Sequence, residues 1–436
     1  MLLGYALFVT RAQWSRYYEE ADCRVSPPMV VIGSDDWGGL EADETPADLD
    51  ALASVLRCFT DGYGRHPVIT VYMVSAVPDF QAIAASGFQK YLWRFCYEGR
   101  PEIVEKWKSL VREGLIDIEF HGREHYNVPL WMTALKDDVP GFREGCRQGN
   151  MGPMTGPGGE PMPKVDPRFR WFKRSFIDAS VYPPRALCVD AHREMIATGL
   201  EIIRQHFGVS PEAAVAPGLV WDTNTWQALE SCGISYIETA DDPIVTVDSK
   251  SRLKPAAVPL RWSTNDYGVR PIIRNCSYEP GVSFAPSTEE VKEVTPGPEE
   301  VSDALQQIRR SLFMGCPAVL QTHSFSYRGE DQARKDAGLR GLKCLLATTL
   351  SEFPGAAFLS APDLGHYIHG TPGKARRPVD FIASAPGFVG RAETTAVCLW
   401  TFHRKLPSLV VIFLGSAVWT VASTARWRRL LAGQDR

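Results

Sequence analysis

Apolar runs and amphipathic segments alternate along the first third of the chain. Short runs rich in Val and Ile at 29–33, 68–74 and 116–120 predict three β-strands. Between them, segments 48–60 and 102–113 carry apolar residues at helical spacing and predict helices. Strands that alternate with helices in this way are typical of an α/β fold in which the strands run parallel.

The same alternation continues to residue 360. Two segments interrupt it: residues 133–190 contain a stretch rich in Gly, Pro and Met, and residues 240–300 end in a polar loop with prolines. We interpret both as insertions that could shape a substrate pocket. The remaining predicted elements are helices at 190–207, 222–232, 300–314 and 332–352 and strands at 213–216, 235–238, 318–321 and 357–360.

The composition is that of a globular protein without a pronounced charge. Of 436 residues, 44% are hydrophobic and 22% are charged, and the formal net charge is −4. These values give no reason to expect a nucleic-acid partner. The ten cysteines are scattered and form no C-x-x-C pair, so we expect reduced thiols rather than a zinc ribbon or a disulfide framework. Reduced thiols favour a cytoplasmic protein.

The two ends of the chain differ from its central part. Residues 1–28 form an N-terminal extension without the basic start and cleavage site of a secretory signal. After a linker at 371–405, residues 406–425 carry no charge and lie between basic residues, and a basic tail follows at 426–436. The uncharged segment is a candidate transmembrane helix, with a buried or surface segment as the alternative. The chain is therefore expected to be cytoplasmic, or anchored to a membrane through 406–425.

Polar residues with ligating or catalytic side chains directly follow several of the predicted strands. In a barrel of parallel strands, the carboxyl ends of the strands meet at one face, and active sites are built there. We therefore expect these residues to lie close together in the folded chain. They are Asp35 and Asp36, His121 and His125, Pro217 and Gly218, and His323.

His121 and His125, in the string His-Gly-Arg-Glu-His, have the spacing of a metal-binding pair. Two imidazoles four residues apart can converge on one divalent cation, and an aspartate completes a facial set with positions open for water and substrate. By itself, the preceding Asp-Asp pair is also typical of a turn or a helix N-cap. The histidine string also fits an inverted zinc-protease motif, but that motif belongs on a helix, and Gly122 argues against a helix there.

Taken together, these strings resemble those of the polysaccharide deacetylases, the NodB-homology or carbohydrate esterase group. The segment 32–38 resembles the family's Thr-Phe-Asp-Asp-Gly motif, and 121–125 resembles its His-[Ser/Thr]-x-x-His motif. The segment 215–226 is a loose match to the groove motif, and 321–323 to the late Leu-x-His motif. The four motifs follow the family's order over 29–368. Several strings look most like a branch found with bacterial surface-polysaccharide genes.

The resemblance implies a fold, a cofactor and residue roles. The fold is α/β, a distorted (β/α) barrel of about seven strands with insertions, over residues 29–370. The activity is removal of N-acetyl or O-acetyl groups from a sugar or polysaccharide by metal-activated water. The cofactor is a divalent cation, Zn²⁺ in the first place, with Co²⁺, Mn²⁺ or Ni²⁺ as alternatives. By motif position, Asp35 is the catalytic base, His323 is the acid, and the metal ligands are Asp36, His121 and His125.

One part of the family pattern is missing. The groove-motif arginine, which orients the catalytic aspartate in the family, is replaced by Val215 or Ala216. Arg123, Arg261 or Arg274 could take its place. If none does, the chain is a catalytically impaired carbohydrate-binding protein on the same scaffold. An amidohydrolase that acts on a small non-sugar amide is a further alternative.

The partner implied by the resemblance is a carbohydrate substrate, held by groups around the metal. Candidate aromatic rings for stacking on a sugar, each of which could instead pack in the core, are Trp37, Tyr126, Trp131, Trp221 and Trp262. The predicted substrate-binding residues are Trp37, Arg123, Asn127, Pro217, Gly218, Trp221 and Arg274.

Overall fold

The computed structural model describes Val25 and residues 27–368, apart from 157, 223, 241–243, 248–249, 251–252, 257–267, 281, 285–290, 294–297 and 314. The linker, the candidate transmembrane segment at 406–425 and the basic tail lie outside the described residues. No helix in the described part of the chain is both long and apolar enough to span a membrane. The described residues fall into two compact units, and the smaller one holds the hairpin of β13 (Val282–Phe284) and β14 (Val291–Glu293).

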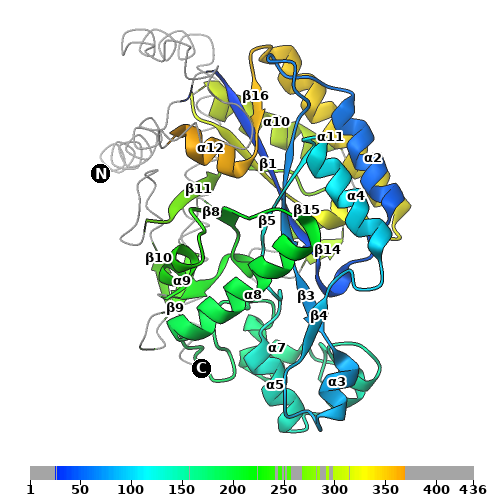
Figure 1. The fold of residues 1–436 in the computed structure, drawn as a ribbon, viewed down its shortest axis with the longest axis vertical. Helices are drawn as coiled ribbons and strands as arrows, with labels where there is room; N and C mark the ends of the chain where they lie inside the picture. The colour runs from blue at the N-terminus through cyan, green and yellow to red at the C-terminus, as the bar shows by residue number, and fades with distance from the viewer. Residues whose placement is uncertain are drawn as a thin grey trace, which may run out of the picture. The chain divides into compact units, whose positions relative to one another are not determined.

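The larger unit is organised around one sheet of parallel strands (Figure 1). The order of pairing is β11-β8-β6-β5-β2-β1-β15-β12, and β16 lies beside β1. β11 and β12 are the first and last strands in this order, and only Asn275 separates them in the chain. The two ends of the sheet are therefore formed by adjacent residues. The strands are β1 (Met29–Gly38), β2 (Ile69–Val74), β5 (Ile116–Phe120), β6 (Ala213–Ala214), β8 (Tyr236–Ala240), β11 (Arg270–Arg274), β12 (Cys276–Ser277), β15 (Ala318–His323) and β16 (Ala357–Leu359).

The sheet is therefore a nearly closed barrel, in which β11 and β12 act as one interrupted strand. The barrel is uneven, because β6 has two residues and meets β5 at the single pair Phe120–Ala214. This confirms the prediction of a distorted (β/α) barrel of about seven strands.

Helices follow one another around the outside of the barrel (Figure 1). Neighbouring helices contact each other in the order α10, α11, α2, α4, α8 and α9. The first of them along the chain begins where the sequence allows it: the Thr45 hydroxyl accepts from the Asp48 N–H, and the Asp48 carboxylate accepts from Thr45, a capping box. The helices are α2 (Pro46–Arg57), α4 (Pro101–Arg112), α8 (Val189–Phe207), α9 (Thr225–Ser231), α10 (Pro298–Phe313) and α11 (Gln332–Glu352).

Side chains along β1 alternate between two apolar clusters, one outside and one inside the barrel. Val30 and Ile32 belong to the large apolar cluster that the outer helices cover. Met29 and Val31 belong to a second cluster together with Leu364 of α12 (Ala361–Ile368), which packs against β1, β8 and β11. The inward positions of β1 are thus apolar at its amino end, and positions 33 and 35 continue that face toward its carboxyl end.

The prediction that residues 240–300 form an insertion was wrong for 270–277, because β11 and β12 are strands of the barrel. The segment Arg270-Pro-Ile-Ile-Arg274 has two apolar residues between arginines, so its pattern is that of a loop. Its burial comes from its neighbours, since it pairs with β8 along its whole length. A three-stranded sheet lies beside it in the chain and consists of β7 (Trp221–Asp222), β9 (Ile244–Val247) and β10 (Leu253–Ala256).

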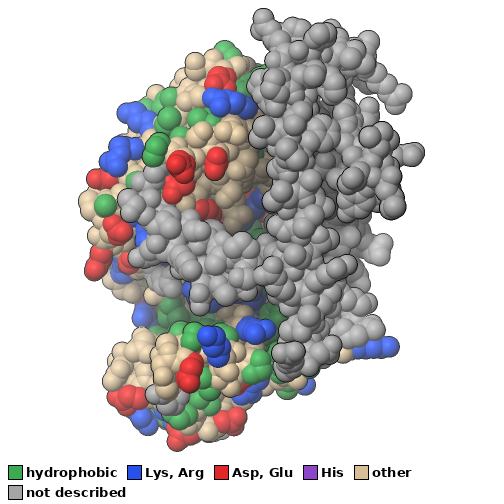
Figure 2. Space-filling view, turned by 180° about the vertical axis from the view of Figure 1, so that it is seen from behind, with side chains coloured by type: hydrophobic (Ala, Val, Ile, Leu, Met, Phe, Trp, Pro, Cys, Tyr) green, Lys and Arg blue, Asp and Glu red, His purple; other side chains and the backbone are tan. Residues whose placement is uncertain are grey.

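Further elements extend from the barrel between β2 and α8. A hairpin of β3 (Ala76–Pro78) and β4 (Trp93–Phe95) follows β2 directly. Its neighbours share a separate apolar cluster that includes Trp131 and Phe142. On the described surface seen in Figure 2, acidic and basic side chains are interspersed. The helices of this region are α3 (Phe80–Ala85), α5 (Val128–Lys136), α6 (Phe142–Arg147) and α7 (Met162–Val165).

Candidate metal-dependent active site

The site begins where β1 becomes irregular. The register between β1 and β2 shifts between Ser34 and Trp37, and Asp36 has a left-handed backbone with φ of 62°. That conformation is uncommon for a residue with a side chain. The Asp36 carbonyl accepts from the Ser324 hydroxyl at 2.7 Å and from the Arg328 guanidinium at 3.3 Å. These two donors hold the bulge, which separates the directions of two consecutive carboxylates.

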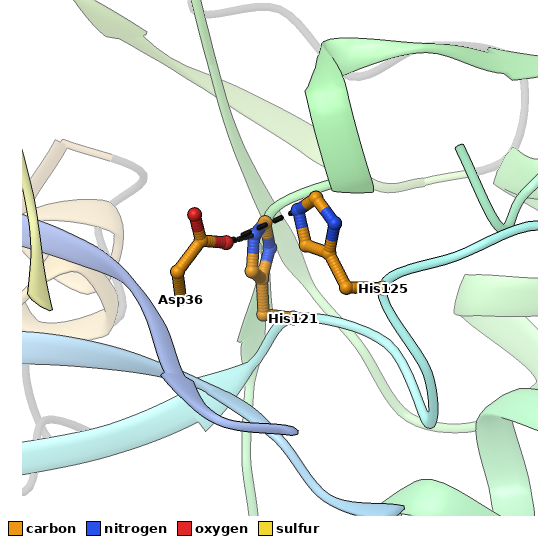
Figure 3. Close-up of side chains that lie close together, drawn as sticks. All are labelled: Asp36, His121 and His125. Carbon is orange, nitrogen blue, oxygen red and sulfur yellow. Dashed lines mark hydrogen bonds and ion pairs between the residues drawn. The ribbon is translucent and has the colours of Figure 1, made fainter. Parts of the chain in front are cut away.

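Asp36, His121 and His125 bring three ligand atoms within 4.8 Å of one another (Figure 3). Oδ1 of Asp36 lies 3.0 Å from Nε2 of His121 and 3.1 Å from Nε2 of His125. Nδ1 of His121 lies 2.9 Å from the Val215 carbonyl. A carbonyl can only accept, so Nδ1 carries the proton, and in a neutral ring the Nε2 lone pair faces the carboxylate. Two acceptors in contact need a proton or a cation between them, which fits a metal site.

The loop that carries the two histidines is irregular. It runs from the end of β5 at Phe120 to the start of α5 at Val128, with Gly122 at φ of +94°. A Cβ at Gly122 would lie 2.8 Å from the Glu124 carbonyl, so glycine is required there. The inverted zinc-protease alternative is therefore wrong, because it needs a helix over these residues.

Asp35 points toward an arginine that the sequence could not single out. Both oxygens of Asp35 accept from Arg274 at 2.6 Å, and Nε of Arg274 donates to Glu238 at 2.7 Å. All three side chains are buried. Gly33 makes room for them, since a Cβ there would lie 2.6 Å from Glu238. Burial alone would raise the pKa of Asp35, but the charge and hydrogen bonds of Arg274 outweigh burial and lower it.

His323 lies beside Asp35 across the β1–β15 pairing, where the two residues are register partners. Its Nδ1 is 2.6 Å from the buried Glu279 carboxylate, and its ring stacks on Phe325. Burial disfavours the charged ring, but the Glu279 carboxylate outweighs burial and raises the pKa of His323 to about 9. The imidazole therefore carries a proton at neutral pH.

Glu238, Glu279 and Arg328 are site residues that the sequence analysis missed. Glu238 had a signal, because it is a carboxylate within a short predicted strand. Glu279 follows β12, a strand too short to be recognised. Arg328 had no signal of its own, since its contact with the Asp36 carbonyl depends on how the loop after β15 folds.

Several predicted substrate-binding residues are packed inside the protein. Trp37 and Trp221 are at most 1% exposed, so neither presents a ring face to a sugar. Asn127 is the N-cap of α5, and its amide also bonds to the carbonyls of Arg174 and Ile177. These contacts give Asn127 a structural role.

The other predicted residues lie in different surroundings. Gly218 is exposed, while Pro217 is buried next to Gly122. Arg123 donates to Glu124, and its guanidinium lies over the rings of Tyr91 and Trp93. Of the remaining predicted residues, Tyr126 and Trp131 are buried, Arg274 bonds to Asp35, and Arg261 and Trp262 lie outside the described residues.

The chain is similar to several solved structures. They include a candidate polysaccharide deacetylase from Mycobacterium smegmatis (13% identity, 80% of this chain and 94% of that chain, TM-score 0.43). A family 4 acetyl xylan esterase from Clostridium thermocellum in complex with a cobalt ion is similar at 12% identity, 79% and 93% coverage and a TM-score of 0.34. A 4-alpha-glucanotransferase from Thermococcus litoralis is similar at 10% identity, 77% and 40% coverage and a TM-score of 0.37. Likeness at this level supports no conclusion about activity.

The sequence itself matches glycosyl hydrolase family 57 over residues 62–288, just over half of the chain. A comparison with curated proteins found no match. The matched segment contains β2, β5, β6, β8, β11 and β12, and with them both candidate metal-binding histidines and Arg274. The motifs resemble those of the polysaccharide deacetylases, but the family shown by the sequence match is a different one. The chain belongs to glycosyl hydrolase family 57.

Proposed function

We propose that this protein is a metal-dependent hydrolase that removes acetyl groups from a sugar or polysaccharide. The observation that carries the proposal is the adjacency of three groups. They are the Asp36–His121–His125 ligand set, a carboxylate held by Arg274, and the protonated His323. Metal-assisted amide or ester hydrolysis needs a Lewis acid, a base and an acid in this arrangement.

The metal site would be formed by Asp36, His121 and His125. Two imidazole nitrogens and one carboxylate oxygen are a donor set that Zn²⁺ accepts, and three protein ligands leave positions for substrate and water. A divalent cation bound there would polarise the acyl carbonyl and acidify a water molecule. The Val215 carbonyl orients the ring of His121 so that Nε2 is free to ligate.

Asp35 is the proposed base. Arg274 occupies one lone pair on each of its oxygens, and one further lone pair on each remains to take a proton from water. The lowered pKa of Asp35 keeps the carboxylate ionised at neutral pH. Arg274 therefore performs the role of the arginine that the groove motif lacks, from a different strand.

His323 is the proposed acid. Its Nδ1 donates to Glu279, so its Nε2 proton is the one available to a leaving amine or alcohol. With a pKa of about 9, the ring holds that proton at neutral pH and can deliver it. Base and acid thus start in opposite protonation states, as the reaction requires.

The proposal is tested by measuring bound metal and acetate release from N-acetylated and O-acetylated glycans. The parent, Asp35→Asn and His121→Ala are compared, each checked for folding by thermal melting. We expect metal in the parent and in Asp35→Asn, but not in His121→Ala. Acetate release should fall by at least about 100-fold in both variants.

Two results would count against the proposal. Metal without acetate release from any substrate would favour a carbohydrate-binding protein or an enzyme for a different amide. A well-folded parent without metal, or His121→Ala with full metal content, would remove the ligand assignment itself.

Hydrolysis of a glycosidic bond is the second candidate function, and the family match supports it. Glycosidases generally use a carboxylic acid and a carboxylate on either side of the bond. In this site Asp35 and Glu238 bond to Arg274, Asp36 contacts two histidines, and Glu279 pairs with His323. The partners of Asp35 and Asp36 outweigh burial and lower the pKa of both carboxyl groups, so neither is a proton donor at neutral pH, which argues for deacetylation. Burial raises the pKa of Glu238 and of Glu279, but each of these carboxylates is bonded to a cationic partner, Arg274 or His323. New reducing ends in place of acetate, lost in Asp35→Asn, would reverse this choice.

A further inference from the structure

Of the seven tryptophans that the structure describes, four are buried, and Trp93 of β4 is the most exposed. Trp37, Trp107, Trp131 and Trp221 are less than 2% exposed, whereas Trp93 is 39% exposed. Part of its side chain is therefore accessible to a ligand.

Arg123 supports this ring from inside the protein. Its guanidinium carbon lies 5.8 Å from the ring centroid of Trp93 and 5.9 Å from that of Tyr91. Nε of Arg123 donates to Glu124 at 2.6 Å, and Glu124 accepts from the Tyr91 hydroxyl at 3.0 Å. Tyr91 in turn contacts the Tyr126 hydroxyl at 2.7 Å. Hydrogen bonds thus hold Arg123 and Tyr91 in place, and Trp93 packs on the guanidinium of Arg123.

Hydrogen bonds attach this hairpin to the loop of the metal ligands. The N–H groups of Ser75 and Ala76 donate to the carbonyls of Gly122 and Arg123 at 3.3 and 2.8 Å. Ala76 begins β3, and Pro78, two residues on, is the register partner of Trp93. Two residues of strand span about 7 Å. Trp93 therefore lies near the carboxyl end of β2, on the side of the site where Arg123 separates the two histidines.

From this geometry we infer that Trp93, backed by Arg123, is a stacking platform for a pyranose ring of the substrate. The axial C–H groups of a sugar are weakly positive and pack on the electron-rich face of an indole. One unit of an oligosaccharide would lie on Trp93 while its neighbour reaches the metal ligands. The inference rests on the proposed function for its substrate class, and it extends that class to oligomers.

The test is oligosaccharide binding, measured by calorimetry on the metal-loaded Asp35→Asn protein so that the sugar is not consumed. The probes are tetramers of β-1,4-linked N-acetylglucosamine, xylose and glucose and of α-1,4-linked glucose. We expect Trp93→Ala to weaken binding of the preferred tetramer about tenfold, and Trp93→Phe to weaken it less. Metal content should not change.

Tyr63 provides the matched control. It is 37% exposed and lies 5.7 Å from the Arg65 guanidinium, in the loop before β2 at the other end of that strand. Tyr63→Ala should leave binding unchanged. Equal affinities for Trp93→Ala and its parent, or no binding of any tetramer, would overturn the platform. If the wild-type protein releases no acetate yet binds a tetramer through Trp93, the proposed function fails and the platform remains.

Discussion

The barrel carries a polar cluster at each end, and the two are built differently. Near its amino end, Nδ1 of His366 lies 3.0 Å from the Tyr236 hydroxyl and its Nε2 lies 2.9 Å from Glu212. At its carboxyl end, His121 and His125 direct their Nε2 atoms at the same oxygen of Asp36. Each nitrogen of His366 thus has its own partner, whereas the two histidines of the site share one.

This difference separates a cluster that fastens two elements together from the candidate metal site. A histidine with separate partners on both nitrogens fastens two elements together, here α12 to the start of β8. Ligand atoms that converge on one point, with lone pairs facing each other, leave a position for a cation. Both ends pair histidine with a carboxylate, so the direction of the atoms decides the role.

The largest effect should come from Arg274→Met at the carboxyl end. Removing this guanidinium leaves the Asp35 and Glu238 carboxylates buried without their partner, which should cost about 3–5 kcal/mol in the free energy of unfolding. Acetate release should fall by at least about 100-fold, because the base loses its orientation. Urea unfolding and an acetate assay measure the two effects.

Arg274→Lys is the matched control, since it keeps the charge but cannot hold both Asp35 oxygens. It should recover part of the stability and little of the activity. Full activity in Arg274→Lys would show that the two-point hold on Asp35 is not needed.

A smaller effect is expected from His366→Ala at the amino end. The Tyr236 hydroxyl and the Glu212 carboxylate each lose a partner, which should lower the free energy of unfolding by about 1–3 kcal/mol. Metal content and acetate release at 25 °C should stay at the parent's values. A loss of metal in His366→Ala would contradict the separation of the two clusters.

The smallest effect is expected from Glu279→Gln, which should change the pH dependence of acetate release. Glu279 raises the pKa of His323 to about 9, so acetate release should decline as the pH rises through that value. In Glu279→Gln, the decline should move toward the ordinary histidine pKa of about 6.5. Since the pKa is raised on folding, the stability gained from the pair is complete below about pH 6.5 and is lost as the pH rises through about 9.

The measurements are a pH–rate profile and urea unfolding at several pH values. The difference in unfolding free energy between the parent and Glu279→Gln should shrink across that window. A decline at the same pH in both proteins would show that another group controls the alkaline limb.

Much of the site could be predicted because its main residues directly follow predicted strands. Asp35, His121 and His323 each end or follow an apolar run, and parallel strands bring such positions to one face. The partners of these residues could not be predicted in the same way. Glu279 follows a two-residue strand, and Arg328 lies in an irregular loop. Nothing in the sequence around Trp93 separates it from the buried tryptophans, because its exposure is a property of the folded chain.

Local pattern alone predicted an α/β fold with parallel strands and predicted that Asp36, His121 and His125 follow strand ends, because side-chain alternation and strand ends are properties of short segments. Only the tertiary structure decided that Arg274, rather than Arg123, holds Asp35. That choice depends on how the barrel closes: β11 pairs with β8, so Glu238 and Arg274 meet inside the barrel. Gly33 of β1 leaves the space in which they reach Asp35. Pairing between strands far apart in the chain depends on register and closure, which no short segment contains.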